Sequence, residues 1–371
     1  MNRMRVGPFV SFALILTAIS ISAWGDPTPP SQPSSGPGGY DYLYGAMTTN
    51  GPYYAEGRDG QDGFKYYLFE PAEPAPPKAP VVLFLHGYIG PLKKPEPRSY
   101  GAWIEHLVRK GHVVVFAQYQ GYAITFPWLY ARNATETWKS ALQRLDTDDS
   151  HVRPARDYKG DYQTAIVGHS LGGYLAAILA AEAGKSDAEI PRPYAVVSIE
   201  PGGLGIVPNT DFSKMSEQTV FVIVVGNDDD VVCKSTAQFL WNETSQILDE
   251  NRDLLFIQSD HHGVPQLTAG HYFPPTAGFL EDAESLDALD FYVTFKLSVA
   301  AVNCAYKGTQ CEYAIGNGSA EQVNLGNWSD GQAVTPMIWI EDPNTLETSC
   351  TDPSVMGCCM PASSVEGHSG G

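Results

Sequence analysis

The stretch AIVGHSLGGYLAAILAAEAG, residues 165–184, places a serine between glycines where an apolar run gives way to an alanine-rich one. The apolar run predicts a buried strand, and the alanine-rich run predicts a helix. Gly168, Ser170 and Gly172 at such a junction have the spacing of a tight strand-to-helix turn that exposes a nucleophilic serine above a sheet. The helix N-terminus directs free N–H groups and a positive dipole end toward such a serine. The spacing therefore predicts that Ser170 is a nucleophile.

Strands and helices alternate along the rest of the chain. Short, continuously apolar runs predict buried strands, and runs with helical periodicity predict the helices between them. The predicted strands are residues 81–87, 112–120, 164–168, 194–200, 219–226 and 254–258. The predicted helices are residues 99–111, 134–145, 170–184, 234–248 and 283–302. This order predicts an α/β fold with a mostly parallel central sheet and helices on both faces.

A carboxylate partner for the serine is expected after a later strand. The run TVFVIVVGNDDDVV, residues 219–232, carries three consecutive aspartates just after its apolar part. Asp229 lies three residues after Gly226, and we interpret its two neighbours as solvated surface carboxylates. Glu200, at the end of the preceding strand, is the alternative acid.

A histidine on the loop after the last short strand is expected to supply the general base. The stretch LLFIQSDHHGVPQLTAGHYFP, residues 254–274, offers His262 and His271. His262 comes four residues after Gln258, so the chain need not travel far to bring its ring to the serine, and this favours His262. A loop that leaves and returns, which Pro265 permits, would bring His271 instead. The sequence leaves both histidines open as the base.

Two further groups of residues complete the expected site. In FLHGYIG, residues 84–90, the backbone N–H of Tyr88 is expected to face the serine together with that of Leu171. Two such donors form an oxyanion hole, and removal of one typically lowers the rate by ~10²–10³. Aromatic side chains in QGYAITFPWLY, residues 120–130, either line a cleft for a hydrophobic substrate or pack under a loop. The cleft candidates are Tyr122, Phe126 and Trp128.

The N-terminus predicts export. Residues 1–25 have a basic start, an apolar centre and small residues at the end, as in a signal peptide. The apolar centre is shorter than the ~20 residues that a membrane span needs, so no stable membrane span is expected. Residues 26–39 are rich in Pro, Gly and Ser, and they predict a flexible leader.

Cysteine content and charge narrow the class of protein further. Six cysteines fit a secreted or periplasmic location, and a small loop closed by Cys304 and Cys311 is one expected disulfide. The others are Cys233, Cys350, Cys358 and Cys359. No zinc-site spacing is present among them, so disulfides are favoured over a metal. The formal net charge of -19 argues against nucleic acid as a partner.

The order Ser, Asp, His, with GHSLGG and the HG after the first buried strand, resembles the α/β-hydrolase fold. The likeness covers residues 54–302 and is greatest to secreted serine esterases and lipases of the cutinase, polyester-hydrolase and chlorophyllase-like groups. The HYFP that begins at His271 resembles the His-Phe-x-Pro of cutinase-like esterases. The alternation of strands and helices fades after Cys304, so a catalytic domain is expected over residues 40–304. Residues 305–371 would form a cysteine-containing extension whose tail is poorly ordered.

The resemblance also implies an activity. Ser170, Asp229 and one of the two histidines would hydrolyse a hydrophobic carboxylic ester through an acyl-enzyme, with no cofactor. The alternatives are another reaction class on the same fold, such as a peptidase or a thioesterase, and a non-catalytic binding module. A binding module normally lacks the serine or the base, whereas every position is filled here. The sequence leaves the substrate and the oligomeric state open.

Overall fold

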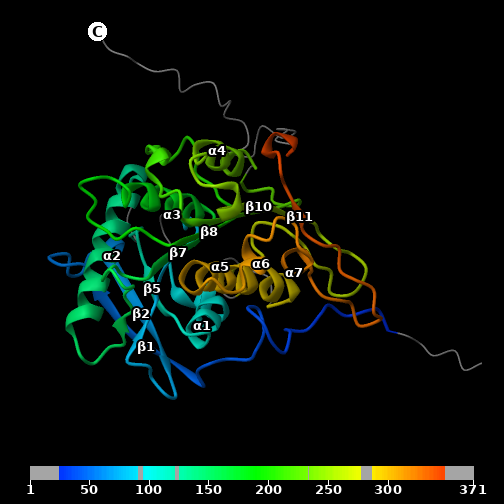
Figure 1. Cartoon of the computed structure of the whole chain (residues 1–371), viewed down its shortest axis with the longest axis horizontal. Coiled ribbons are helices and arrows are strands. Elements are labelled where there is room, and N and C mark those ends of the chain that lie inside the picture. Colours follow the sequence, from blue (N-terminus) through cyan, green and yellow to red (C-terminus); the bar gives the residue numbers. More distant parts are fainter. Residues whose placement is uncertain (1–24, 91–94, 122–124, 233, 277–285, 347–371) are drawn as a thin grey trace, which may run out of the picture.

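The computed structural model describes residues 25–90, 95–121, 125–232, 234–276 and 286–346. These residues contain a nine-stranded sheet in the order β1-β2-β5-β4-β7-β8-β9-β10-β11 (Figure 1). Its strands are β1 (Ala46–Tyr54), β2 (Lys65–Ala72), β4 (Val81–Leu85), β5 (Val113–Ala117), β7 (Thr164–His169), β8 (Ala195–Ile199), β9 (Val220–Gly226), β10 (Arg252–Ile257) and β11 (Ile338–Trp339). The six strands from β5 to β10 in this order run parallel, and β1, β2 and β11 pair antiparallel at the edges.

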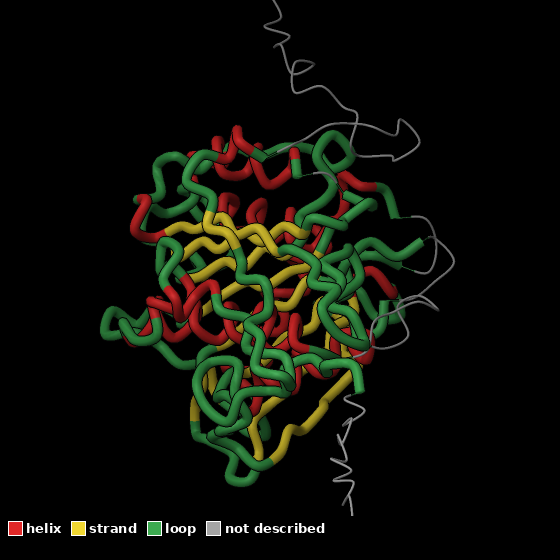
Figure 2. Tube along the Cα trace, turned by 90° about the vertical axis from the view of Figure 1, so that its right-hand side faces the viewer, coloured by secondary structure: helices red, strands yellow, loops and turns green. Residues whose placement is uncertain are grey.

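Helices cover both faces of the sheet. On one face lie α2 (Tyr130–Thr147), α3 (Leu171–Glu182) and α4 (Ser235–Glu243), and on the other lie α1 (Gly101–Arg109) and α5 (Lys296–Lys307). Figure 2 shows helices on both sides of the strands. The predicted fold class, a mostly parallel sheet with helices on both faces, is therefore confirmed.

Short elements fill the connections. A two-stranded parallel sheet pairs β3 (Lys78–Ala79) with β6 (Arg153–Pro154). The predicted helix over residues 283–302 includes the π-helical turn η6 (Asp290–Phe295), which leads into α5. The remaining short helices are η1 (Asp62–Phe64), η2 (Pro97–Tyr100), η3 (Pro127–Leu129), η4 (Phe212–Lys214), η5 (Asp249–Asn251), α6 (Cys311–Ala314), α7 (Ala320–Val323) and η7 (Pro343–Thr345).

The central strands bury both of their faces, which explains their continuous apolar sequences. In β4, Val81, Leu83 and Leu85 pack in the cluster that contains α2 and α3. Val82 and Phe84 of the same strand pack in the cluster that contains α1 and α5. A parallel strand covered on both sides requires this pattern. The edge strands β1 and β2 mix polar and apolar residues, and the sequence pattern did not predict them.

The leader, residues 26–39, is held against the rest of the protein, so the prediction of a flexible leader is wrong. The backbone N–H of Val264 donates to the carbonyl of Pro27 at 2.8 Å. Further along, His106 Nε2 donates to the carbonyl of Pro37 at 2.7 Å. The prolines restrict the backbone, and the carbonyls of the leader find donors along the surface they follow. The predicted signal peptide, residues 1–25, lies outside the described residues except for Gly25.

The described part of the C-terminal extension also packs on the sheet. β11 pairs with β10, and Cys304 forms a disulfide with Cys311, so the expected pairing of these two is confirmed. The expected domain boundary at residue 304 falls inside α5, which continues to Lys307. The other four cysteines and the tail from residue 347 lie outside the described residues.

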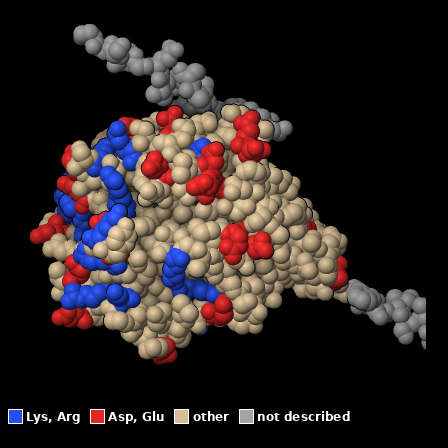
Figure 3. Space-filling view, viewed as in Figure 1, with Lys and Arg blue, Asp and Glu red and all other residues tan. Residues whose placement is uncertain are grey.

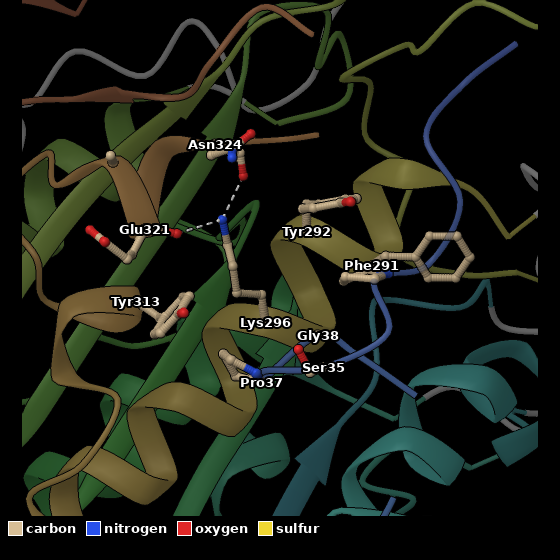
Figure 4. Close-up of a pocket in the computed structure, with 11 residues that line it drawn as sticks. Ser35, Pro37, Gly38, Phe291, Tyr292, Lys296, Tyr313, Glu321 and Asn324 are labelled. Atoms are coloured by element: carbon tan, nitrogen blue, oxygen red, sulfur yellow. Dashed lines mark hydrogen bonds between the residues drawn. The ribbon is translucent and has the colours of Figure 1, made fainter. Parts of the chain in front are cut away.

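A buried lysine joins the extension to the leader. Lys296, at the start of α5, donates to three backbone carbonyls around the end of α7, those of Glu321 at 3.3 Å, Gln322 at 2.6 Å and Asn324 at 2.8 Å. Figure 4 shows its Nζ directed toward Glu321 and Asn324, in a pocket of about 250 Å³ that Pro37 of the leader also lines. Three acceptors match the three N–H groups of an ammonium. The leader, α5 and α7 therefore meet at this lysine.

Basic side chains gather over the side of the molecule that carries α2 (Figure 3). Several are paired with carboxylates there. Arg58 and Arg132 both bind Glu136 at 2.8 Å, and Lys139 binds Glu189 at 2.8 Å. These three basic groups share two carboxylates, so their charge is partly compensated locally, and the chain as a whole carries -19. Within the described part of the chain, no helix combines the length and the apolar character that crossing a bilayer requires.

Replacing Lys296 by Met should lower the free energy of unfolding by about 3 kcal/mol, because three buried carbonyl groups lose their donor. Urea denaturation measures this loss. Lys139→Met is the matched control, since Lys139 is exposed and its ion pair is expected to contribute less than ~1 kcal/mol. Equal destabilisation by the two substitutions would contradict the role given to Lys296.

Candidate active site

The turn between β7 and α3 holds Ser170 in a strained backbone conformation. Its φ is 56° and its ψ is -125°, a left-handed region that non-glycine residues rarely adopt. The flanking glycines are required by close approach. A Cβ at Gly168 would lie 2.2 Å from the carbonyl oxygen of Gly172, and one at Gly172 would lie 2.1 Å from that of Leu85 in β4. The sequence pattern thus reflects how closely α3 approaches the strands.

Three side chains form a hydrogen-bonded row at this turn. Ser170 Oγ lies 2.9 Å from His271 Nε2, and His271 Nδ1 lies 2.8 Å from Asp229 Oδ2. The Asp229 carboxylate can only accept, so His271 donates to it from Nδ1 and accepts the hydrogen bond of the serine hydroxyl at Nε2. The side chains of His271 and Asp229 are 4% and 2% exposed. This arrangement can take a proton from the serine hydroxyl.

Asp229 is held as a carboxylate despite its burial. Burial raises the pKa of Asp229, but the hydrogen bond and charge of His271 oppose this effect, with hydrogen bonds from Glu200 and Val232. The net pKa of Asp229 lies below its ordinary value of 3.8. Its Oδ1 also accepts the backbone N–H groups of Val231 and Val232, each at 2.9 Å. Asp229 therefore keeps a negative charge directed at His271.

The two candidate histidines are separated by the path of their loop. Asp260 and Leu267 exchange backbone hydrogen bonds of 2.8 and 2.9 Å, which closes a small turn over residues 261–266. The turn carries His262 away from Ser170, and the chain then returns with His271. His262 Nε2 instead lies 2.8 Å from Asp330 in the C-terminal extension. The expectation from chain length, which favoured His262, fails because the loop is closed on itself.

Glu200, the alternative acid, lies behind Asp229 instead of replacing it. Glu200 directly follows β8 with a φ of 47°, and it is 1% exposed. Burial and the neighbouring charge of Asp229, to which Glu200 is hydrogen-bonded, raise the pKa of Glu200 well above its ordinary value of 4.5. Two buried carboxyl groups in contact share one proton, and here Glu200 carries it. The sequence treated the two acids as alternatives, whereas the structure brings both to the site.

The loop after β4 passes beside the serine, as the expected oxyanion hole requires. A Cβ at Gly87 would lie 3.2 Å from Ser170 Cβ, so the peptide that leads to Tyr88 lies next to Ser170. Leu171 is the first residue of α3 and follows the serine directly. The two backbone groups expected to bind a developing oxyanion therefore flank Ser170.

Two of the three cleft candidates are described, and both are exposed. Phe126 and Trp128 stack with ring centroids 4.4 Å apart and are 50% and 60% exposed, so they are not core packing. Their segment is tied to the loop after β4, because Gln120 exchanges hydrogen bonds of 3.0 and 3.2 Å with the backbone of Ile89. Tyr122 lies outside the described residues. Among the described residues, no group of three or more His, Cys, Asp or Glu side chains is arranged to hold a metal ion.

Comparison with known proteins agrees with this architecture. A family model described as alpha/beta hydrolase fold matches residues 80–220, which run from the start of β4 to the start of β9 and include Ser170. No curated protein matches the chain. The chain has the α/β-hydrolase fold. Asp229 and His271 lie beyond the matched residues, so their placement beside Ser170 comes from the structure alone.

The free energy of unfolding of the Glu200→Gln variant should rise relative to that of the native protein as the pH increases above about 4.5. The unfolded chain loses the Glu200 proton near its ordinary pKa of 4.5, whereas the folded protein retains it at higher pH. The native free energy of unfolding therefore falls with rising pH over that window, and a glutamine removes this dependence. Urea denaturation between pH 4 and pH 8 measures the difference.

The matched control is Glu189→Gln, which removes an exposed carboxylate whose side chain is 63% accessible. Its stability difference from the native protein should change much less with pH. If Glu200→Gln and the native protein kept a constant difference over the whole range, the assignment of the proton to Glu200 would be wrong.

Proposed function

We propose that this α/β-hydrolase-fold protein is a secreted carboxylic ester hydrolase, an esterase or lipase, that works through Ser170, His271 and Asp229. The observation that carries the proposal is the hydrogen-bonded row of these three side chains at a strained strand-to-helix turn. Strain at a non-glycine residue persists only where the surrounding structure enforces it, and it is typical of functional sites. The fold supports a hydrolase as the general class.

The first half of the reaction forms an acyl-enzyme. His271 Nε2 accepts the proton of Ser170 as Oγ attacks the ester carbonyl. The carbonyl oxygen becomes negative, and the backbone N–H groups of Tyr88 and Leu171 stabilise it. The imidazolium then gives its proton to the oxygen of the departing alcohol. Asp229 keeps His271 in the tautomer that presents a lone pair to the serine, and it stabilises the imidazolium.

The second half returns the enzyme to its starting state. Water enters after the alcohol has left, and His271 takes a proton from it as it attacks the acyl carbonyl. The same two backbone groups hold the second tetrahedral intermediate. Its collapse breaks the bond to Ser170 Oγ, which recovers its proton from His271. The carboxylic acid leaves, and no cofactor enters any step.

The surroundings of the serine support a hydrophobic substrate. Tyr88 is 51% exposed beside Ser170, and the stacked pair Phe126 and Trp128 is exposed on a segment tied to the same loop. Exposed aromatic side chains of this kind bind apolar acyl or aryl groups. An open surface also accepts large substrates, so we include polyesters in the proposed substrate range. The alternative classes, peptidase and thioesterase, use the same three side chains and differ in substrate.

Export is part of the proposal. A signal peptide over residues 1–25 and a disulfide between Cys304 and Cys311 fit an oxidising compartment. Cleavage after Gly25 leaves Pro27, whose carbonyl accepts the N–H of Val264, in the mature chain. The leader therefore keeps its contacts after processing.

Ser170→Ala should lower turnover of p-nitrophenyl esters by about 10⁶-fold, because members of such a triad act as a unit. The native protein should hydrolyse esters faster than matched peptide or thioester substrates, and a fluorophosphonate should label Ser170. If the native protein is labelled at Ser170 but cleaves only peptides or thioesters, the ester assignment is overturned. The assignment of Ser170 as the nucleophile then stands. Without labelling or any turnover, the proposal as a whole fails.

His271→Ala should reduce turnover by several orders of magnitude, close to the loss from Ser170→Ala. His262→Ala is its matched control, because His262 lies on the same loop but contacts Asp330 instead of Ser170. It should leave kcat close to the native value. A large loss from His262→Ala with a small one from His271→Ala would reverse the assignment of the base.

The exported protein should begin near Asp26, and reduction should increase its intact mass by the hydrogens of at least one disulfide. Mass spectrometry of purified protein with and without reductant measures both. A chain that keeps Met1, or a mass unchanged by reductant, would contradict export through an oxidising compartment.

A further inference from the structure

Tyr100, at the end of η2, connects three parts of the site that lie far apart in the sequence. The backbone N–H of Gly87 donates to Tyr100 Oη at 2.9 Å. Tyr100 Oη lies 2.8 Å from His169 Nδ1, and His169 Nε2 lies 2.9 Å from the carbonyl oxygen of His271. Tyr100 and His169 are both fully buried. The loop after β4, the nucleophile turn and the base loop are therefore joined by one series of hydrogen bonds.

We propose that Tyr100 and His169 are positioning residues that hold the oxyanion-hole loop and the base loop in register with Ser170. This inference rests on the proposed function, because positioning matters only if Ser170 is the nucleophile. It assigns a role to two buried polar side chains that do not themselves contact the reacting atoms.

The chemistry of the groups fixes the direction of each hydrogen bond. The carbonyl of His271 can only accept, so His169 donates to it from Nε2. Burial lowers the pKa of His169 well below its ordinary value of 6.5, so the ring is neutral and Nδ1 carries a lone pair. Tyr100 must then donate to Nδ1 while its oxygen accepts the N–H of Gly87. Hydrogen bonds aligned in one direction polarise one another.

The peptide group before the oxyanion hole is held at both ends. Tyr100 binds the N–H of Gly87, and the hydroxyl of Tyr119 donates to the carbonyl of His86. Gly87 then sets the direction of the next peptide, which carries the N–H of Tyr88. There is little space around Gly87, because a Cβ there would lie 3.2 Å from Tyr100 Oη, His169 Nδ1 and Ser170 Cβ. A small rotation of the held peptide would move the N–H of Tyr88 away from the carbonyl oxygen of the substrate.

The base is held through its backbone by the same series. His169 binds the carbonyl of His271, and the two rings lie with centroids 4.9 Å apart. Ring contact and backbone hydrogen bond together restrict how the His271 side chain can turn toward Ser170. Both partners that Ser170 needs, the base and the oxyanion donor, thus depend on His169 and Tyr100. Transition-state stabilisation of this kind falls steeply with small displacements.

Tyr100→Phe tests the inference, because it removes the hydroxyl and keeps the ring that packs on Phe84 with centroids 5.1 Å apart. We expect kcat for a p-nitrophenyl ester to fall by ~10- to 10²-fold, less than the loss of an oxyanion donor itself. KM should stay near the native value, because the ground-state ester does not use these contacts. Phenylboronic acid, which forms a tetrahedral adduct with the serine, should bind more weakly by a similar factor.

Tyr66→Phe is the matched control. Tyr66 is also buried, and its hydroxyl accepts from Arg144 Nε at 3.1 Å, but it lies on β2 and has no contact with the site. Both substitutions remove one buried phenol hydroxyl, so both should lower the midpoint of thermal unfolding. Only Tyr100→Phe should change kcat and the affinity for phenylboronic acid. Equal kinetic effects from the two would reduce Tyr100 to a structural role and overturn the inference.

A second variant keeps the test decisive if Tyr100→Phe does not fold. His169→Phe keeps a flat aromatic ring but loses both the donor for the carbonyl of His271 and the acceptor for Tyr100. It should also lower kcat with little change in KM. The double variant should lose no more than the worse single variant, since both break one series. Additive losses of kcat in the double variant, or a native kcat in a folded Tyr100→Phe protein, would refute the inference. Ester turnover by the native protein would still support the proposed function in that case. If the native protein neither turns over esters nor binds the boronic acid, the proposed function fails first.

Discussion

The left-handed backbone of Ser170 is the constraint on which the site is built. A conformation of this kind costs on the order of 1–3 kcal/mol at a non-glycine residue, so neighbouring contacts must enforce it. The serine N–H donates to the carbonyl of Ile199 in β8 at 2.9 Å, and its own carbonyl accepts the N–H groups of Gly173 at 2.9 Å and Gly202 at 3.1 Å. The turn is thus fixed between a strand, a helix and the loop after β8. From this turn its hydroxyl faces His271 Nε2 at 2.9 Å.

Around this turn, several buried polar side chains bind one another in sequence. Glu200 binds Asp229, which binds His271, which faces Ser170. A buried carboxylate is costly unless it is paired and hydrogen-bonded, and the neutral Glu200 lets Asp229 keep its charge without a second negative group. A site assembled in this way is rigid, because displacement of any member leaves a buried polar atom without its partner.

The segments outside the α/β core act on the same site through the base loop. Asp260, near the start of that loop, accepts the backbone N–H and the hydroxyl of Thr335 at 2.7 and 3.0 Å. The leader adds a hydrogen bond from the N–H of Val264 to the carbonyl of Pro27. The loop is therefore held on its outer side by the extension and the leader, and on its inner side by Asp229. Residues expected to form a leader and an extension therefore contact the loop that carries His271.

Sequence alone determined what local physics dictates. Continuous apolar runs predict strands buried on both faces, and these runs predicted the fold class. The glycines around Ser170 predicted the tight turn that carries this serine, because side chains there would collide with neighbouring backbone. Only the tertiary structure decided among residues whose local patterns are equivalent. The turn closed by hydrogen bonds between Asp260 and Leu267 contains His262 and precedes His271. The number of residues between each histidine and the strand does not reveal this turn. The leader looked flexible because its hydrogen-bond donors come from residues far along the chain. Tyr100 carried no sequence signal, because its role depends on three loops that meet only in the folded protein.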